Sequence, residues 1–129
     1  MSLEQAVHER WAASQALAAL LPADRVSTGR SSCPTVPYAT ILPERRQTAL
    51  RTNAGDTVDE VTLRVNVWHE AYGAGRAIVE QVRAAFDRAA FELPGGGRVL
   101  HMRRTSESAA QHGDGLWQLS IQFLARVCL

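Results

Sequence analysis

Four histidines are the side chains with the widest chemical use in this 129-residue chain. A metal site needs a second His, Cys or carboxylate at a fixed spacing, such as H-x-x-x-H or C-x-x-C. Glu70 follows His69 directly, but no second histidine lies at helical spacing from it. We therefore expect neither a metal nor another cofactor. The four histidines are His8, His69, His101 and His112.

Three further patterns contain residue types used in catalysis or phosphate binding. Ser106, His112 and Asp114 are the types of a hydrolytic triad, but the G-x-S-x-G turn that presents a nucleophile is missing. Gly95–Gly97 lacks the Lys-Ser/Thr of a P-loop and follows a predicted helix, which indicates a cap and turn. No motif near Cys33 indicates an activated thiol. These patterns predict that the protein is not an enzyme.

The arginines carry more information than the histidines. All 14 Lys+Arg residues are arginine, against 13 Asp+Glu, so the net charge is only +1. A dedicated nucleic-acid binder usually has a clear basic excess. Guanidinium groups suit carboxylates and phosphates alike, so these side chains indicate contact with a neighbouring subunit, contact with passing nucleic acid or a merely solvated surface. The five candidates are Arg45, Arg46, Arg51, Arg103 and Arg104.

The segment from Glu44 to Asp56 concentrates positive charge between two predicted strands. It is longer than the usual hairpin loop of 2–5 residues, so we predict the far end of a long hairpin or a flexible loop. At an interface between copies, its arginines would meet carboxylates of a neighbour. Candidates are Asp59, Glu60 and Glu107.

Two helices are predicted from apolar residues at helical spacing. The first begins near Leu3, buries a stripe through Val7, Trp11 and Leu17, and ends at Pro22. The second runs from about Gly75 to Phe91. Its apolar stripe contains Ile78, Val82, Ala85, Phe86 and Ala89.

Four strands complete the pattern. Alternation is clearest from Glu60 to Val67 and from Leu116 to Val127, and weaker from Arg98 to Thr105. A short strand begins at Pro37, and Pro43 places its continuation at a sheet edge. The polar stretch from Ser106 to Gly115 is predicted to be a loop. The strand residues expected in the core are Val61, Leu63, Val65, Val67, Leu119, Ile121 and Phe123.

The order α-β-β-α-β-β predicts an α+β fold. Two helices would pack on one face of a largely antiparallel four-stranded sheet, leaving the other face polar. No linker or repeat divides residues 1–129, so we expect one domain. No signal peptide and no apolar run of membrane-spanning length are visible, which predicts a cytoplasmic protein without membrane contact.

The order of segments resembles the tail-completion, or tail-terminator, family of long-tailed phages and gene transfer agents. The resemblance rests on the strand Pro37–Ile41, on Val61–Trp68 before a Gly-containing break into a helix, and on the ending His112–Phe123. It covers nearly the whole chain. It implies a structural protein without catalytic residues.

The resemblance also implies partners. A ring, usually of six copies, would cap the tail tube and join it to the head–tail connector, first in the host cytoplasm and then in the particle. Passing DNA is a further contact. The alternatives are a head–tail adaptor or another neck protein, and a small ligand-binding α+β domain, which would need a concave site with convergent polar groups.

Overall fold

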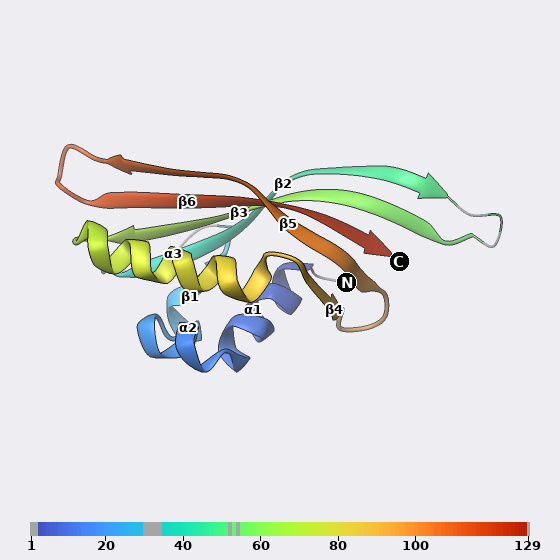
Figure 1. Cartoon of the computed structure of the whole chain (residues 1–129), viewed down its shortest axis with the longest axis horizontal. Helices are drawn as coiled ribbons and strands as arrows, with labels where there is room; N and C mark the ends of the chain where they lie inside the picture. The colour runs from blue at the N-terminus through green and yellow to red at the C-terminus, as the bar shows by residue number, and fades with distance from the viewer. Residues whose placement is uncertain (1–2, 30–34, 52, 54, 129) are drawn as a thin grey trace.

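The computed structural model describes residues 3–29, 35–51, 53 and 55–128. Figure 1 shows long strands above a layer of helices. The elements are α1 (Leu3–Ala13), α2 (Gln15–Leu20), the 3-10 turn η1 (Ala23–Arg25), β1 (Val26–Thr28), β2 (Tyr38–Arg51), β3 (Thr57–His69), α3 (Tyr72–Phe86), β4 (Ala89–Glu92), β5 (Arg98–Gln111) and β6 (Trp117–Cys128).

The sheet corrects the predicted fold class. It is mixed and curled, has six strands in the order β1-β2-β3-β6-β5-β4, and is accompanied by three α-helices in the described residues. The expected four antiparallel strands and two helices were wrong. The prediction missed β1, which pairs in parallel with β2, and β4, which pairs antiparallel with β5, because both are too short to show a period.

Two long hairpins, β2–β3 and β5–β6, form most of the sheet. They meet at its centre, where β3 and β6 pair without a register shift from Val58 to His69. Figure 1 shows their tips pointing to opposite ends of the molecule, with α1, α2 and α3 on one side of the sheet. The helices therefore cover one face, the helix face, and leave a helix-free face, as the polar alternation predicts.

The core lies between the helices and the two central strands. Every strand residue expected there is buried, as are Ile78, Val82 and Phe86 of α3. On β5 the alternation is interrupted, because the register shifts between Val99 and His101. This bulge brings Val99 and Met102 to the same face, where both are buried, although their spacing is odd.

The first helix is split at Ser14. Its side chain accepts a hydrogen bond from the Leu17 amide and caps α2, so the predicted single helix is two. Serine favours such caps over helix interiors because its hydroxyl competes for backbone amides. The buried Trp11 indole donates to the Leu21 carbonyl at 2.9 Å and holds the two helices together.

Helix α3 ends earlier than predicted, and Ala89 lies in β4. Arg88 adopts a positive φ of 64°, and its amide donates to the Met102 carbonyl, so the chain turns directly from helix into strand. At the other end, Gly75 lies so close to the sheet that an added Cβ would stand 2.7 Å from Leu119. The glycine that breaks the sequence pattern thus allows close helix–sheet packing.

The two predicted polar loops are mostly strand. The segment from Glu44 to Asp56 belongs to β2 as far as Arg51, so the long-hairpin interpretation is correct and the flexible loop is wrong. The stretch from Ser106 to Gln111 continues β5. The second stretch was missed because this part of β5 has no apolar alternation to mark it as a strand.

Candidate functional site

The distal part of each hairpin forms an arm. We define the β2–β3 arm as Leu42–Arg51 with Thr57–Leu63, and the β5–β6 arm as Ser106–Gln111 with Trp117–Gln122. All ten residues of the β2 segment are exposed, and on the β5 segment only Glu107 is half-buried. Strands this exposed gain little stability from burying their own side chains.

Cross-strand pairing assigns the five arginine candidates to opposite faces. Arg45 pairs with Thr62 and Arg103 with Leu124, and Thr62 and Leu124 pair with each other, so these four residues form one row across the helix-free face. By the same alternation, the other three arginines lie on the helix face. Those three are Arg46, Arg51 and Arg104.

The helix-free face is basic as well as polar. Among the residues paired in the sheet, its glutamates are Glu44, Glu60 and Glu92. The arginines on the same face are Arg45, Arg64, Arg98, Arg103 and Arg126. This surface therefore carries a positive excess that the net charge of +1 conceals.

One polar network spans all four long strands of this face. Glu44 Oε1 accepts from Arg64 Nε at 2.9 Å and from Gln122 Nε2 at 3.0 Å. Gln122 Oε1 in turn accepts from the Thr105 hydroxyl at 3.1 Å. Glu44 and Thr105 occupy register shifts of β2 and β5. The hydrogen bond from Gln122, with a smaller contribution from Arg64, lowers the pKa of Glu44 against the effect of burial.

A second ion pair holds the β2–β3 arm on its helix face. Arg46 Nε lies 2.9 Å from Asp59 Oδ2, and the carboxylate side chain is only 11% exposed. The hydrogen bond from Arg46 lowers the pKa of Asp59, and Arg51 contributes a smaller electrostatic effect in the same direction. These charges stabilise the arm beyond the hydrophobic core.

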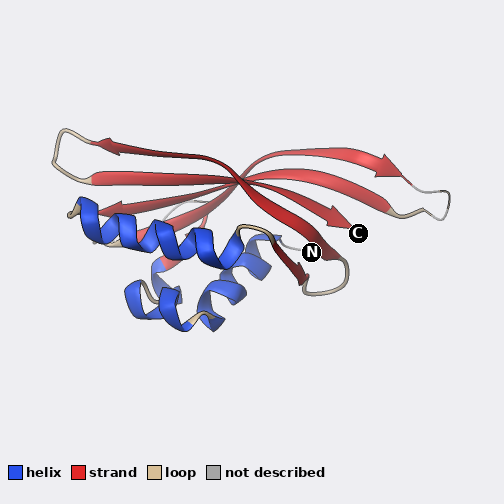
Figure 2. Cartoon of the chain, viewed as in Figure 1, coloured by secondary structure: helices blue, strands red, loops and turns tan. Residues whose placement is uncertain are grey.

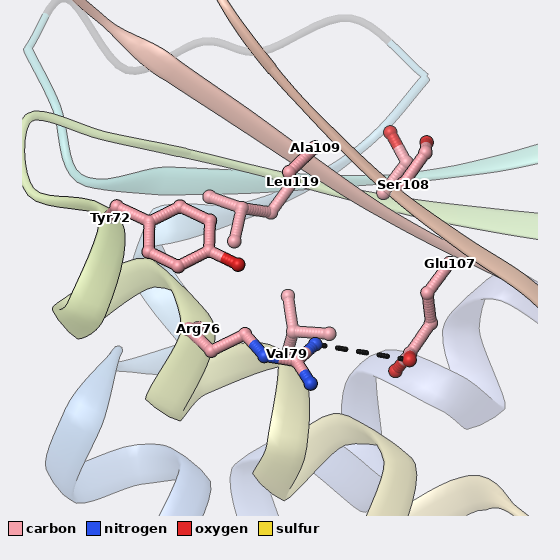
Figure 3. A pocket seen from close by; sticks show the side chains of 8 residues that line it. Tyr72, Arg76, Val79, Glu107, Ser108, Ala109 and Leu119 are labelled. Carbon is pink, nitrogen blue, oxygen red and sulfur yellow. Dashed lines mark ion pairs between the residues drawn. The ribbon is translucent and has the colours of Figure 1, made fainter.

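Glu107 anchors the β5–β6 arm to α3. Its Oε2 lies 3.8 Å from Arg76, 3.8 Å from Arg83 and 3.4 Å from Arg104. Beside it is a cavity of about 290 Å³, which Tyr72 and Leu119 also line; Figure 3 shows Arg76 reaching across it towards Glu107. The cavity opens where Ser108 and Ala109 form the outer strand, so it borders the sheet edge.

The three carboxylates predicted to pair with arginines of a neighbouring copy all pair with arginines of this chain. Asp59 binds Arg46, Glu107 lies among three arginines, and Glu60 accepts from Arg126 at 3.1 Å. Of the candidate arginines, Arg46 and Arg104 therefore meet carboxylates of their own subunit. Sequence reasoning missed the network of Glu44, Gln122 and Thr105, since no sequence pattern marks the bulges that align these side chains.

The other chemically interesting residues do not converge. Ser106 donates to Gln122, the His112 ring contacts the Gln118 amide oxygen, and Asp114 accepts from a backbone amide of its own turn. Cys33 lies outside the described residues. Across the described ranges, no group of three or more His, Cys, Asp or Glu side chains is placed to hold a metal ion. None of the helices described combines the length and apolar composition required to cross a bilayer.

Comparison with known proteins decides the family. The family model described as tail completion protein gp17 matches residues 5–128. The chain belongs to this family. It is therefore a structural protein of phage-type tails, and the resemblance seen in the sequence is confirmed.

A solved structure shares the fold of this chain. A chain from a solved structure titled "Virion of native gene transfer agent (GTA) particle" has a TM-score of 0.78 and 18% sequence identity to this tail completion protein. The alignment covers 99% of this chain and 96% of that chain. At this identity the likeness concerns the fold. No curated protein matches the chain.

Proposed function

We propose that this tail completion protein assembles into a closed ring, of about six copies, at the head-proximal end of a tail. The ring caps the tail tube and contacts the head–tail connector. The observation that carries the proposal is the pair of arms, which extend to opposite ends of the sheet and whose outer strands are exposed. In a ring, each subunit presents one surface to a different surface of its neighbour.

The helix-free face is the surface we assign to the lumen. Its arginine excess suits DNA phosphates, and a ring repeats each weak contact once per copy. The row that contains Arg45 and Arg103 places one arginine on each edge strand of the face. The helix-face arginines stabilise the arms.

Two sets of alanine substitutions separate these roles. The lumen set replaces Arg45 and Arg103, and the arm set replaces Arg46, Arg51 and Arg104. We expect the lumen set to leave rings intact, as measured by native mass spectrometry and electron microscopy of tails, and to lower DNA retention by the particles.

The arm set should instead reduce ring formation, because it removes Arg46 from Asp59 and one of the three arginines around Glu107. Replacing Arg88, which is exposed and lies on neither arm, supplies the control. Absence of rings in the unchanged protein, both free and on tails, would contradict the proposal. If the lumen set forms rings and DNA retention is unchanged, the assignment of the helix-free face to the lumen is wrong.

A further inference from the structure

The outer edges of β2 and β5 are open in a complementary way. Strand β1 covers β2 only as far as Ile41, whose carbonyl accepts from Gly29. Strand β4 covers β5 only as far as Met102, and Asp87 then caps the amide of Arg104. Beyond these points, neither edge has a strand partner among the described residues.

From these edges we infer that neighbouring copies in the ring join β5 of one copy to β2 of the next, so that one sheet continues around the ring. This inference rests on the ring proposed above and names its interface. Unpaired strand edges present rows of amide and carbonyl groups that readily take up another strand. The occupant of each edge is the opposite edge of a second copy.

Strand direction fits this arrangement. Each neighbour in the order β2-β3-β6-β5 is antiparallel, so β2 and β5 run in opposite directions within one copy. Rotation about a ring axis preserves these directions, so β5 of one copy meets β2 of the next antiparallel. The same rotation places the helix-free faces of all copies on the same side of the continuous sheet, which forms the wall of the ring.

The register follows from where β1 and β4 end. Ser108, in the open part of β5, shares a row with Asn66 of β3, and Gln47, in the open part of β2, shares a row with Glu60. Placing Ser108 opposite the neighbour's Gln47 offsets the two copies by 66 − 60, six residues along the strands. The offset must be even, because an odd one would exchange the two faces.

An offset of four is too small. It would place β1 of the neighbour level with Gln111 of β5, and β4 level with the neighbour's Arg51, so strands would overlap. An offset of eight loses part of the pairing. At an offset of six, β5 and the neighbour's β1 lie one after the other in the same strand position without overlap. The same holds for β4 and the neighbour's β2. The two short strands therefore limit the register.

The same offset gives a wall of ordinary barrel geometry. Six residues extend about 20 Å along a strand, and the four strands that each copy adds span about 19 Å across the wall. Their ratio corresponds to a strand tilt of about 45°, close to the 35–45° of closed barrels. For six copies, 24 strands at this tilt give a diameter of about 50 Å.

The diameter determines which face points inward. Helices are about 10 Å across, and the helical layers on this face comprise α1 and α3, which contact the sheet, and α2, which packs against them. Inside a wall about 50 Å wide, these layers from opposite sides would occupy most of the lumen. The helices therefore stand outside and the basic helix-free face inside. The cavity beside Glu107 borders the seam and is closed by the neighbour's β2.

Disulfide cross-linking tests the seam. In a background with Cys33→Ser and Cys128→Ser, Gln47→Cys combined with Ser108→Cys places two thiols on facing strands of adjacent copies. Opposite residues of antiparallel strands stand about 4.5–5.5 Å apart between Cα atoms, within disulfide range. Within one copy these positions are three strands and six rows apart, so any disulfide joins two copies.

We expect mild oxidation of assembled rings to give a ladder of covalent oligomers that ends at the ring size. Gln47→Cys with Arg103→Cys is the matched control, because Arg103 lies on the same face of β5 outside the predicted seam, and it should give no ladder. Rings that form without a ladder, or equal ladders in both pairs, would overturn the seam and leave the ring standing. If no rings form in the unchanged protein, the ring itself fails.

Discussion

The two arms have the same architecture and opposite chemistry. Each is a hairpin whose outer strand carries two register shifts, whereas the central strands β3 and β6 pair with each other without any. The β2–β3 arm is charged and held by pairs such as Arg46–Asp59. The outer strand of the β5–β6 arm has small neutral residues except for Glu107, which fastens it to α3.

This difference shows how one sheet can present two unlike edges. Side-chain charges stabilise the β2–β3 arm where the hydrophobic core has ended, whereas the β5–β6 arm uses a helix as support. Small side chains at Ser108, Ala109 and Ala110 leave its backbone accessible at the edge. An edge with long charged side chains can pair with an edge that has small side chains, whereas two edges with long charged side chains would crowd and repel each other.

The largest loss of stability is expected from a substitution in the core that both hairpins share. Phe86 is fully buried and packs edge-to-face against Phe123 of β6, with ring centroids 6.2 Å apart. Phe86→Ala should lower the free energy of unfolding by about 3–5 kcal/mol. Urea denaturation measures this value. Phe91→Ala, at a half-buried position on β4, is the control and should cost clearly less; equal losses would argue against this account of the core.

The second-largest loss of stability is expected when the anchor of the β5–β6 arm is removed. Glu107→Ala removes the carboxylate shared by three arginines, and we expect a loss of about 1 kcal/mol, since the arginines are partly exposed. Amide hydrogen exchange at Ala109 and Ala110 should accelerate. Glu60→Ala, whose partner Arg126 is 60% exposed, should cost less and leave that exchange unchanged. Identical exchange in the two variants would contradict the anchoring role.

Acid should loosen the β2–β3 arm selectively. The pKa values of Glu44 and Asp59 are lowered by folding from ordinary values of 4.5 and 3.8. Their stabilising contribution is therefore complete above those values and is lost as the pH falls through the lowered pKa values. Between about pH 5 and pH 2, Glu44→Gln with Asp59→Asn should lose less stability than the unchanged protein. Equal losses across this range would refute the assignment.

The smallest effect is expected on the helix-free face. Among the described residues, the Arg103 side chain makes no hydrogen bond or ion pair, and the Arg45 side chain hydrogen-bonds only to Gln47, at 3.1 Å. Alanine at both positions should change stability by less than about 0.5 kcal/mol. Thermal unfolding measures this. A larger loss would mean that the two arginines stabilise the fold rather than remain available to a ligand.

The sequence predicted the parts of the fold that bury apolar side chains. The period of two on β3 and β6 correctly identified the central strands, and the stripe through Ile78 and Phe86 identified α3. It failed where burial ends, because strand pairing outside the core leaves no apolar alternation. For this reason Ser106–Gln111 is predicted to be a loop, whereas β4 is predicted to be the end of a helix because it is too short to show a period.

The candidate site was only partly predictable for the same reason. Charge clustering pointed to Arg45, Arg46 and Arg51, but the division between faces depends on the bulge at Glu44, which no sequence pattern signals. The open edges are also invisible in the sequence, because they depend on where β1 and β4 end. Such boundaries are decided by pairing between distant segments.

The central pairing of β3 with β6 has a consequence for how the chain folds. Each hairpin closes locally, across the few residues of its turn, whereas Leu63 must find Phe123, 60 positions away in the sequence. Joining the hairpins is therefore the slow, entropically costly step. Until it occurs, both hairpins expose their apolar sides and inner edges, so newly made chains are most prone to aggregate at this stage.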